Sequence, residues 1–400
     1  MQYHVRILAG RLDRSAGSHV YHQQLARRLA ARGHRVSVVC FQAVPEVREC
    51  AETFEVSLAP YEKARLIWRF TALLQHWHCT RQLLRQSLPP ADVVVGGEHL
   101  FLRGHSRLFP ETPWIYLPHS LVVDQEIKSY ELSPVMEVVS TRVYVTLQRW
   151  ALNHAHRTLR FTRQACEALE AKYGRAIKPR FFVNPMGIEV PPHHIKTDET
   201  RIVRLLWAGR LIPSKRIDVA LTALAKLHQY GWRFDIIGDG VARDSLESYT
   251  RQLGLAGRVQ FHGFQADPSP WYCGADLLLF PSRLESLGLV VLESMSHGVP
   301  CLAMRGDGIR FHTANAEIVR HGVDGFLAAC DEDFCMQLEK LLQTPQVLWS
   351  AGKAARATVE RQYTWDQHLD RYEDLFDELI CAQKRGSLLR MEARVGRPNS

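Results

Sequence analysis

Short apolar runs alternate with segments of helical periodicity along the first half of the chain. Tyr21, Leu25 and Leu29 recur at helical spacing, and Gly33 predicts the end of that helix. Apolar, β-rich runs predict strands at residues 3–9, 36–41, 92–96 and 114–118. This half is therefore predicted to alternate strands and helices.

The second half repeats the alternation more regularly. Strands are predicted at residues 203–208, 233–237, 259–261, 277–281, 299–303 and 325–328, and helices at 217–230, 242–253, 289–297 and 314–321. The pattern of residues 331–383 indicates helices only. Because strands that alternate with helices form parallel sheets, the two sets predict an α/β protein with two doubly wound, Rossmann-like domains.

A proline-rich segment separates the two sets. Three prolines and a glycine lie within residues 185–192, and polar residues follow, as is typical of a linker. The predicted parts are an N-terminal domain at residues 1–184, a C-terminal domain at 185–361, a helix at about 364–383 that packs back on the N-terminal domain, and a disordered tail at 384–400.

The composition narrows the class of protein. Of the 400 residues 46% are hydrophobic and 23% are charged, and no apolar run approaches the ~20 residues of a membrane span. A disordered chain, a fibrous repeat and a membrane bundle are excluded. Nine cysteines without a CxxC pair indicate free thiols in a reducing compartment. We expect a cytoplasmic protein without a secretory signal.

The net charge of +8 is unevenly spread. Residues 1–184 carry 25 Lys and Arg against 15 Asp and Glu, whereas the remaining residues carry 25 against 27. The excess positive charge of the first half favours an anionic partner, such as phospholipid, a polyanionic glycan, nucleic acid or a phosphorylated substrate. A merely basic surface remains an alternative.

Two cations follow the first predicted strand of the second half. Gly209 ends the strand, Arg210 follows it, and Lys215 precedes the next helix. Both cations should lie at the carboxyl edge of the sheet, beside a helix N-terminus that favours negative charge. Arginine and lysine there suit a diphosphate, although an ordinary solvated turn would have the same composition.

Two carboxylates and a glycine accompany a later helix. Glu285 is expected near the helix start, Gly288 lets backbone amides approach a ligand, and Glu293 follows about two helical turns later. Two acceptors with bare amides suit a polyol attached to a phosphate. A capped helix with an incidental second glutamate is the alternative.

The two segments together resemble the retaining GT-B glycosyltransferases of family 4. Members carry G-R-x(3–4)-K-[GR] and E-x-[FL]-G-x(4)-E, which read here Gly209-Arg210…Lys215-Arg216 and Glu285…Gly288…Glu293. The resemblance is strong over residues 185–380 and weak over the first half. It implies the GT-B fold, in which two Rossmann-like domains face a central cleft.

The resemblance also implies roles for individual residues. Arg210 and Lys215 would neutralise the departing diphosphate of a nucleotide-sugar. Glu293 would accept hydrogen bonds from the ribose hydroxyls, and Glu285 would contact a hydroxyl of the donor sugar. The resemblance implies no metal or other cofactor.

Further donor-binding residues follow from the same resemblance. Gly209 and the amides around Leu287 and Gly288 would hold the sugar and the distal phosphate. Leu287 stands where the family commonly has Phe. In the first half, Gly17 corresponds to a small-residue loop before the first long helix, and His119, at a strand end, would position a sugar hydroxyl.

These observations predict a retaining transferase that moves a hexose from a UDP-, GDP- or ADP-sugar to an acceptor hydroxyl, on a lipid-linked or cell-envelope glycan. Two alternatives stay open: a basic nucleic-acid or polyanion binder without catalysis, and a nucleotide-sugar epimerase on the same fold. No GxGxxG follows the first strand, which disfavours a dehydrogenase. Under the leading hypothesis no nucleic-acid partner is expected.

Residues 61–86 form a basic stretch with interleaved apolar residues and two tryptophans. Such a stretch is typical of a helix that lies on an anionic membrane, and it predicts peripheral contact with the inner membrane face. A helix that packs on its own domain with an arginine-rich solvent face is equally compatible with the pattern.

Overall fold

The computed structural model describes residues 1–10, 12, 17–56, 78, 80–83, 85–118, 134–192, 202–285, 287–308 and 310–395. The chain divides into two compact units. The N-terminal unit comprises Met1–Arg160, Cys166–Asn184 and Leu369–Ser400, and the C-terminal unit comprises Phe161–Ala165 and Pro185–His368.

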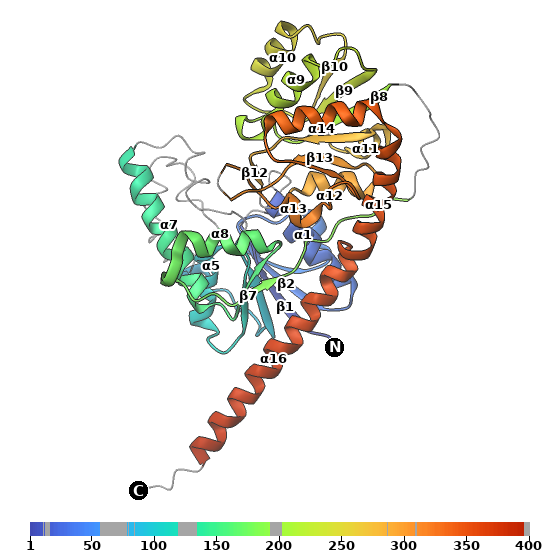
Figure 1. The fold of residues 1–400 in the computed structure, drawn as a ribbon. Coiled ribbons are helices and arrows are strands. Elements are labelled where there is room, and N and C mark those ends of the chain that lie inside the picture. The colour runs from blue at the N-terminus through green and yellow to red at the C-terminus, as the bar shows by residue number, and fades with distance from the viewer. Residues whose placement is uncertain are drawn as a thin grey trace. The chain divides into compact units, whose positions relative to one another are not determined.

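The N-terminal unit contains a parallel sheet of seven strands in the order β3-β2-β1-β4-β5-β6-β7 (Figure 1). Its strands are β1 (His4–Leu8), β2 (Arg35–Cys40), β3 (Glu52–Glu55), β4 (Val93–Gly96), β5 (Trp114–Tyr116), β6 (Arg157–Arg160) and β7 (Phe181–Val183). Its helices include α1 (Gly17–Ala31), α2 (Pro45–Arg48), α5 (His99–Leu108), α7 (Pro134–His154) and α8 (Arg163–Tyr173), and a short 3-10 turn, η1, follows at Gly174–Ala176.

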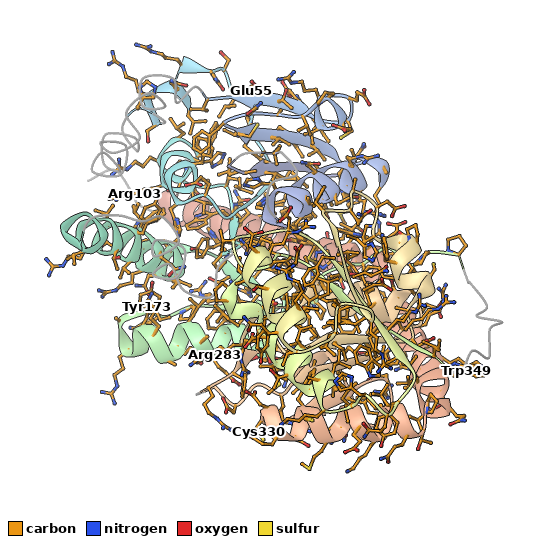
Figure 2. All side chains as sticks on the ribbon, turned by 90° about the horizontal axis from the view of Figure 1, so that it is seen from above. Glu55, Arg103, Tyr173, Arg283, Cys330 and Trp349 are labelled. Atoms are coloured by element: carbon orange, nitrogen blue, oxygen red, sulfur yellow. The ribbon has the colours of Figure 1, made fainter. Side chains whose placement is uncertain are left out.

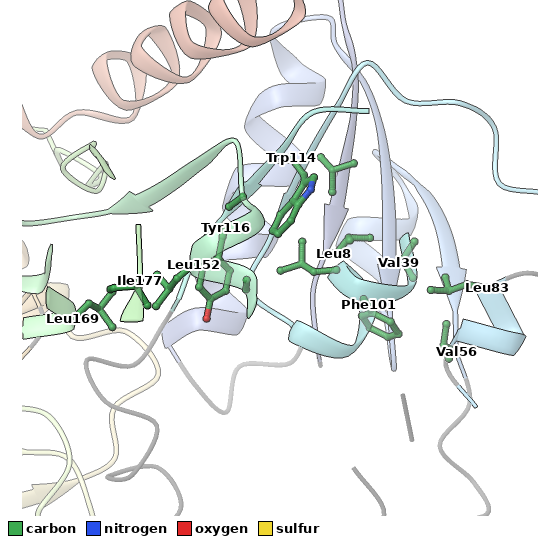
Figure 3. Packing of buried hydrophobic residues seen from close by; sticks show 14 of the residues in the cluster. Leu8, Val39, Val56, Leu83, Phe101, Trp114, Tyr116, Leu152, Leu169 and Ile177 are labelled. Carbon is green, nitrogen blue, oxygen red and sulfur yellow. The ribbon is translucent and has the colours of Figure 1, made fainter. Parts of the chain in front are cut away.

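The apolar residues of these strands form the core of the unit. Leu8, Val39 and Trp114 come from three strands and pack with Phe101 of α5 and Leu152 of α7 (Figure 3). Burial of each such side chain stabilises the fold by about 1.5–3 kcal/mol. The core therefore fixes the strand ends that carry the candidate residues of this unit.

The C-terminal unit contains a second parallel sheet, of six strands in the order β10-β9-β8-β11-β13-β15. Its strands are β8 (Val203–Ala208), β9 (Trp232–Ile237), β10 (Val259–Gly263), β11 (Leu277–Phe280), β13 (Cys301–Met304) and β15 (Phe326–Ala328). A separate two-stranded sheet pairs β12 (Leu284–Glu285) with β14 (His312–Thr313). The order reverses between β8 and β11, as in doubly wound folds. The prediction of two Rossmann-like α/β domains is confirmed.

The predicted helices of this unit lie close to their expected places, and α11 is a helix that the sequence did not predict. They are α9 (Ile217–Ala225), α10 (Arg243–Gln252), α11 (Ser269–Gly274), α12 (Leu289–Ser296), α13 (Asn315–Ile318), α14 (Asp331–Gln343) and α15 (Gln346–Gln362), with the 3-10 turn η2 at Pro213–Lys215. Helix α9 ends five residues earlier than predicted. The amides of Lys226 and Leu227 bond to carbonyls three residues back, which tightens the chain into a turn.

The last helix is longer than the sequence suggested. Helix α16 runs from Trp365 to Val395, so residues 384–395 are helical where a disordered tail was expected. This segment has no proline and is rich in Leu, Arg, Met, Glu and Ala, which extend an existing helix at little cost.

Within the N-terminal unit, α16 packs against α1 and β1. The hydroxyls of Tyr372 and Tyr21 lie 3.0 Å apart, and Tyr3 donates a hydrogen bond to Asp377. Among the described residues, no helix has the length and apolar character that crossing a bilayer requires.

Candidate functional site

The carboxyl end of β8 carries the predicted cations. Gly209 follows the strand with a positive φ of 133°, and Arg210 is exposed. The Arg210 side chain forms no hydrogen bond or ion pair with any residue that the structure describes. The chain then forms η2, and Arg216 takes the left-handed conformation at φ 55° before α9 begins. The turn thus directs two successive cations, Lys215 and Arg216, to different partners.

Two neighbouring loops are joined by backbone hydrogen bonds at this edge. The amide of Gly209 donates to the carbonyl of Ile237 at 3.1 Å, and the amide of Leu211 donates to that of Asp239 at 2.9 Å. A Cβ at Gly238 would lie 1.9 Å from the carbonyl oxygen of Gly209. The β9 loop needs glycine there because the β8 loop passes so close to it.

Lys215 and Glu285 are brought together. The Lys215 ammonium donates a hydrogen bond to Glu285 Oε1, and each side chain is 15% exposed. The backbone holds the pair in place, since the amide of Arg283 donates to the carbonyl of Ser214 at 3.0 Å and Glu285 is paired with Thr313 in the small sheet. Two residues 70 positions apart therefore form one charged unit.

The expectation that Glu285 lies at the helix start is wrong. Glu285 ends strand β12, and α12 begins only at Leu289. Thr313 pairs with Glu285 across the small sheet, and the amide of His312 donates to the carbonyl of Arg283 at 2.9 Å. These backbone contacts from β14, far away in the sequence, hold the segment extended.

Gly288 caps the start of α12 in the left-handed conformation, with φ 73° and ψ 56°. A Cβ at this position would lie 3.2 Å from Asn315 Oδ1. That oxygen and Ser282 Oγ are buried without a hydrogen-bond partner among the described residues. Leu287 is buried, at 4% exposure. The turn therefore places the unpartnered oxygen of Asn315 beside an open backbone, as a site for a polar ligand requires.

Glu293 has a partner that the sequence analysis missed. The hydroxyl of Tyr272, in α11, donates a hydrogen bond to Glu293 Oε2 at 2.9 Å. Burial raises the pKa of Glu293, and the hydrogen bond from Tyr272 opposes that rise. No sequence signal pointed to Tyr272, because the two residues are 21 positions apart on different helices. No contact joins Glu293 to Lys215 or Arg210 among the described residues.

In the N-terminal unit, Gly17 is the first residue of α1. His119 lies outside the described residues, but the residue before it, Pro118, is described. The carbonyl of Pro118 accepts a hydrogen bond from the guanidinium of Arg160, which is 3% exposed. Burial lowers the pKa of Arg160 to about 10. The sequence analysis also missed this residue, whose charge and position in a short strand suggest a surface.

A chain of polar side chains surrounds the same strand ends. His99 Nε2 lies 2.6 Å from the hydroxyl of Tyr116, and Tyr173 donates a hydrogen bond to Gln148 Oε1. Gln148 Nε2 lies 3.5 Å from the Tyr116 hydroxyl. Burial lowers the pKa of His99 to about 4, so this ring is neutral near pH 7.

The described residues contain no group of three or more His, Cys, Asp or Glu side chains that could hold a metal ion. The candidate site is thus a set of charged and hydroxyl-accepting side chains at the carboxyl edge of the C-terminal sheet. Its chemistry suits an anionic ligand with attached hydroxyls.

The chain matches two family models. Residues 15–190 match the model described as Glycosyltransferase Family 4, and residues 203–344 match Glycosyl transferases group 1. The two matches cover every strand of the two parallel sheets except β1.

Curated relatives agree with these matches. A D-inositol 3-phosphate glycosyltransferase of Thermobispora bispora is 26% identical over 404 residues, which cover 92% of this chain and 90% of the relative. An exopolysaccharide phosphotransferase of Streptomyces coelicolor is 31% identical over 59% of this chain, which covers 24% of that protein. The chain spans only 24–47% of the length of this protein and of two other curated relatives that it matches.

Solved structures share the fold. A sucrose-phosphate synthase from Thermosynechococcus elongatus is 18% identical and matches with a TM-score of 0.72, over 96% of this chain and 100% of that one. The Anabaena protein HepE, in complex with UDP-glucose, is 17% identical with a TM-score of 0.68, over 94% of this chain and 99% of that one.

The two parallel sheets and these structural matches show that the protein has the GT-B fold. With both family models matched, the chain belongs to the family 4 (group 1) glycosyltransferases.

Proposed function

We propose that this protein transfers a hexose from a nucleotide-sugar to an acceptor hydroxyl, with retention at the anomeric carbon. The observation that carries the proposal is the contact of Lys215 with Glu285 at the same sheet edge as the exposed Arg210. A diphosphate needs cations that a ligand can reach, and a sugar needs acceptors beside them. Both kinds of group are present at this edge.

In the proposed mechanism, Arg210 and Lys215 bind the diphosphate and stabilise the charge that develops as the bond to the anomeric carbon breaks. An incoming phosphate would replace Glu285 as the partner of the Lys215 ammonium. The Glu285 carboxylate would then be able to accept a hydrogen bond from a hydroxyl of the donor sugar. The cations would supply the charge that a metal ion supplies in other transferases, so we propose that no metal is required.

The remaining residues would hold the rest of the donor. The amides near Gly209, Leu287 and Gly288 would bind phosphate and sugar oxygens. Glu293 Oε1 would accept hydrogen bonds from the ribose hydroxyls, while Glu293 Oε2 accepts the hydrogen bond from Tyr272.

In the N-terminal unit, Gly17 would place amides near the phosphate, and His119 would position a sugar hydroxyl. The departing diphosphate and the attacking acceptor hydroxyl would lie on one face of the sugar, because no carboxylate pair suited to double displacement was found in the sequence.

We further propose that the C-terminal unit binds the donor and the N-terminal unit the acceptor, a cell-envelope or lipid-linked glycan. Similarity to HepE, whose structure contains UDP-glucose, supports a UDP-sugar among the candidate donors. Residues 61–86, proposed to contact anionic membrane, lie largely outside the described residues. Cytoplasmic location at the inner membrane face is part of the same proposal.

A donor panel tests the proposal. The thermal midpoint would be measured with UDP, GDP, ADP and their sugars, with and without EDTA. A ligand at one hundred times its Kd stabilises the fold by about 2.7 kcal/mol, so one nucleotide should raise the midpoint clearly. The Arg210→Ala variant should lose that shift. If no nucleotide stabilises the protein, or if EDTA abolishes the effect, the donor site is assigned wrongly.

A further inference from the structure

Polar residues interrupt the apolar runs of strands β8, β9 and β10, which is unusual in a parallel sheet. Parallel strands are normally covered on both faces and read as continuous apolar runs. Here Arg204 is in register with Arg233, and Asp235 is in register with Gln260. Since residues in register point to the same face, three adjacent strands place their polar side chains on one face.

The helices leave this polar face partly uncovered. The connections β8-α9-β9 and β9-α10-β10 step outward in one direction, so right-handed crossovers place α9 and α10 together on the apolar face (Figure 1). The connection from β10 through α11 returns toward β11, which puts α11 on the opposite face, where it contacts β8. A groove lies between α11 and the polar strands.

This groove has a volume of about 330 Å³, within the range of ligand sites. Arg233 and Gln260 from the strands and Trp271 from α11 contribute to its lining. The side chains of Arg233 and Gln260 are both exposed and have no hydrogen-bond partner among the described residues. At Gly274, which also lines the groove, a Cβ would meet nothing within 4 Å. The groove is therefore open and offers polar groups that no other residue uses.

The aromatic wall of the groove is held in place. Asp235 Oδ1 lies 2.7 Å from His262 Nε2, and the His262 ring packs on Trp271 with centroids 4.0 Å apart. The carboxylate fixes the imidazole, and the imidazole supports the indole. By contrast, Arg258 donates its hydrogen bonds to backbone carbonyls and stacks on Trp232, so it serves the fold.

We propose that this groove binds a glycan chain, at a site separate from the donor site. An indole offers a flat apolar surface to the C–H face of a pyranose ring, and planar groups such as guanidinium, amide and carboxylate match pairs of hydroxyls. Arg233 adds affinity for acidic sugars. Arg204 lies near the start of β8 and Arg210 just beyond its end, about 20 Å apart at a strand rise of ~3.3 Å per residue. One sugar cannot contact both sites.

Affinity electrophoresis of the purified full-length protein tests this proposal. The protein is run through native gels that contain dextran, a neutral glucan, or alginate, a uronate polymer, without any nucleotide-sugar. Wild type should be retarded by both polymers, and by alginate more strongly at low salt. Trp271→Ala should raise the apparent Kd at least tenfold for both, whereas Trp271→Phe should keep part of the binding. Arg233→Ala should lose only the preference for alginate over dextran.

Matched variants control for general surface effects. Trp349→Ala removes another exposed indole, on α15 (Figure 2), and Arg251→Ala removes an exposed guanidinium on α10. Both should bind within twofold of wild type. Thermal midpoints verify that each variant is folded.

The proposal is wrong if neither polymer retards the wild type, or if Trp271→Ala binds like the wild type. It is also wrong if polyphosphate competes for the groove regardless of Trp271, because that would indicate a simple anion site. Since no donor is present, these results are independent of the proposed transfer reaction.

Discussion

The two sheets have the same architecture, but the cations at their carboxyl edges differ in exposure and in their partners. At the edge of the C-terminal sheet, Arg210 is exposed, and Lys215 and Glu285 are each 15% exposed and paired. At the edge of the N-terminal sheet, Arg160 is 3% exposed and donates to the carbonyl of Pro118. No carboxylate pairs with Arg160 among the described residues.

We infer from this difference that the exposed cations bind a ligand, whereas the buried cation positions the chain. A cation that is partly exposed and paired can exchange its carboxylate for an incoming phosphate without a large change in desolvation. A fully buried cation cannot reach a ligand, and its burial costs free energy. We infer that Arg160 instead orders the chain after β5, which leads to His119.

The largest effect should follow from removing a cation at the exposed edge. Arg210→Ala or Lys215→Met should lower kcat by about 10²–10³, equivalent to roughly 3–4 kcal/mol of barrier, because we propose that each cation stabilises the leaving-group charge. Steady-state turnover of the donor identified in the thermal panel measures this. Lys353→Met, an exposed lysine on α15, is the control and should retain full activity. Near-wild-type turnover of Arg210→Ala would refute its assignment.

A double variant sharpens the same point. Lys215→Met alone leaves Glu285 as an unpaired, partly buried charge, so the free energy of unfolding should fall by about 1–3 kcal/mol. Adding Glu285→Gln should restore most of that stability while turnover stays low. Recovery of turnover together with stability would indicate that the pair serves only the fold.

Tyr272→Phe should reduce stability by about 1.5–3 kcal/mol near pH 7, because it removes a hydrogen bond to a charged group. Burial raises the pKa of Glu293, so the folded state holds its proton to higher pH than the unfolded state does. The free energy of unfolding therefore falls as pH rises from the unfolded pKa through the folded pKa. The Tyr272 hydrogen bond lowers the pKa of Glu293. Without it, the pH range over which the free energy of unfolding falls should extend to higher pH.

Urea denaturation between pH 4 and 8 measures that change. Tyr249→Phe is a matched control, since the Tyr249 hydroxyl lies 2.9 Å from the neutral hydroxyl of Thr222. The control should lose stability by the same amount at every pH. Parallel pH curves for Tyr272→Phe and wild type would contradict the role of Tyr272.

Arg160→Met tests the buried edge. The substitution should lower turnover about tenfold, because the carbonyl of Pro118 loses its donor and the chain end at Pro118 loses its support. The free energy of unfolding should fall by less than about 1 kcal/mol, or rise, because a buried charge is removed. Arg175→Met, at an exposed residue of η1, is the control. A large loss of stability with unchanged turnover would assign Arg160 to the fold.

The smallest effect is expected at Gly288. An alanine there would take the left-handed conformation at a cost of about 1 kcal/mol and would approach Asn315 Oδ1 at 3.2 Å. The KM for the donor should rise, since the amides of this turn would shift. Gly257→Ala, whose Cβ would meet nothing within 4 Å, should leave both quantities unchanged. Equal behaviour of the two variants would remove Gly288 from the donor site.

The elements that could be predicted from the sequence are those with a regular local pattern. The strand of residues 203–208 matches β8, and the helix of residues 289–297 differs from α12 by one residue. Strand β6 was not predicted, because its two arginines are typical of a surface segment. In the structure Arg160 is nevertheless buried. The extension of α16 was missed because the polar residues 384–395 suit a frayed tail as well as a helix.

The two-domain α/β plan and the types of residue at the candidate site follow from the sequence, because periodicity and motif spacing are local properties of the chain. Which side chains meet depends on the three-dimensional fold. Lys215 forms a hydrogen bond with Glu285, 70 residues away in the sequence. Glu293 does so with Tyr272, and Arg160 with the carbonyl of Pro118. Such contacts depend on strand order and on the paths of connecting loops, which no local pattern records.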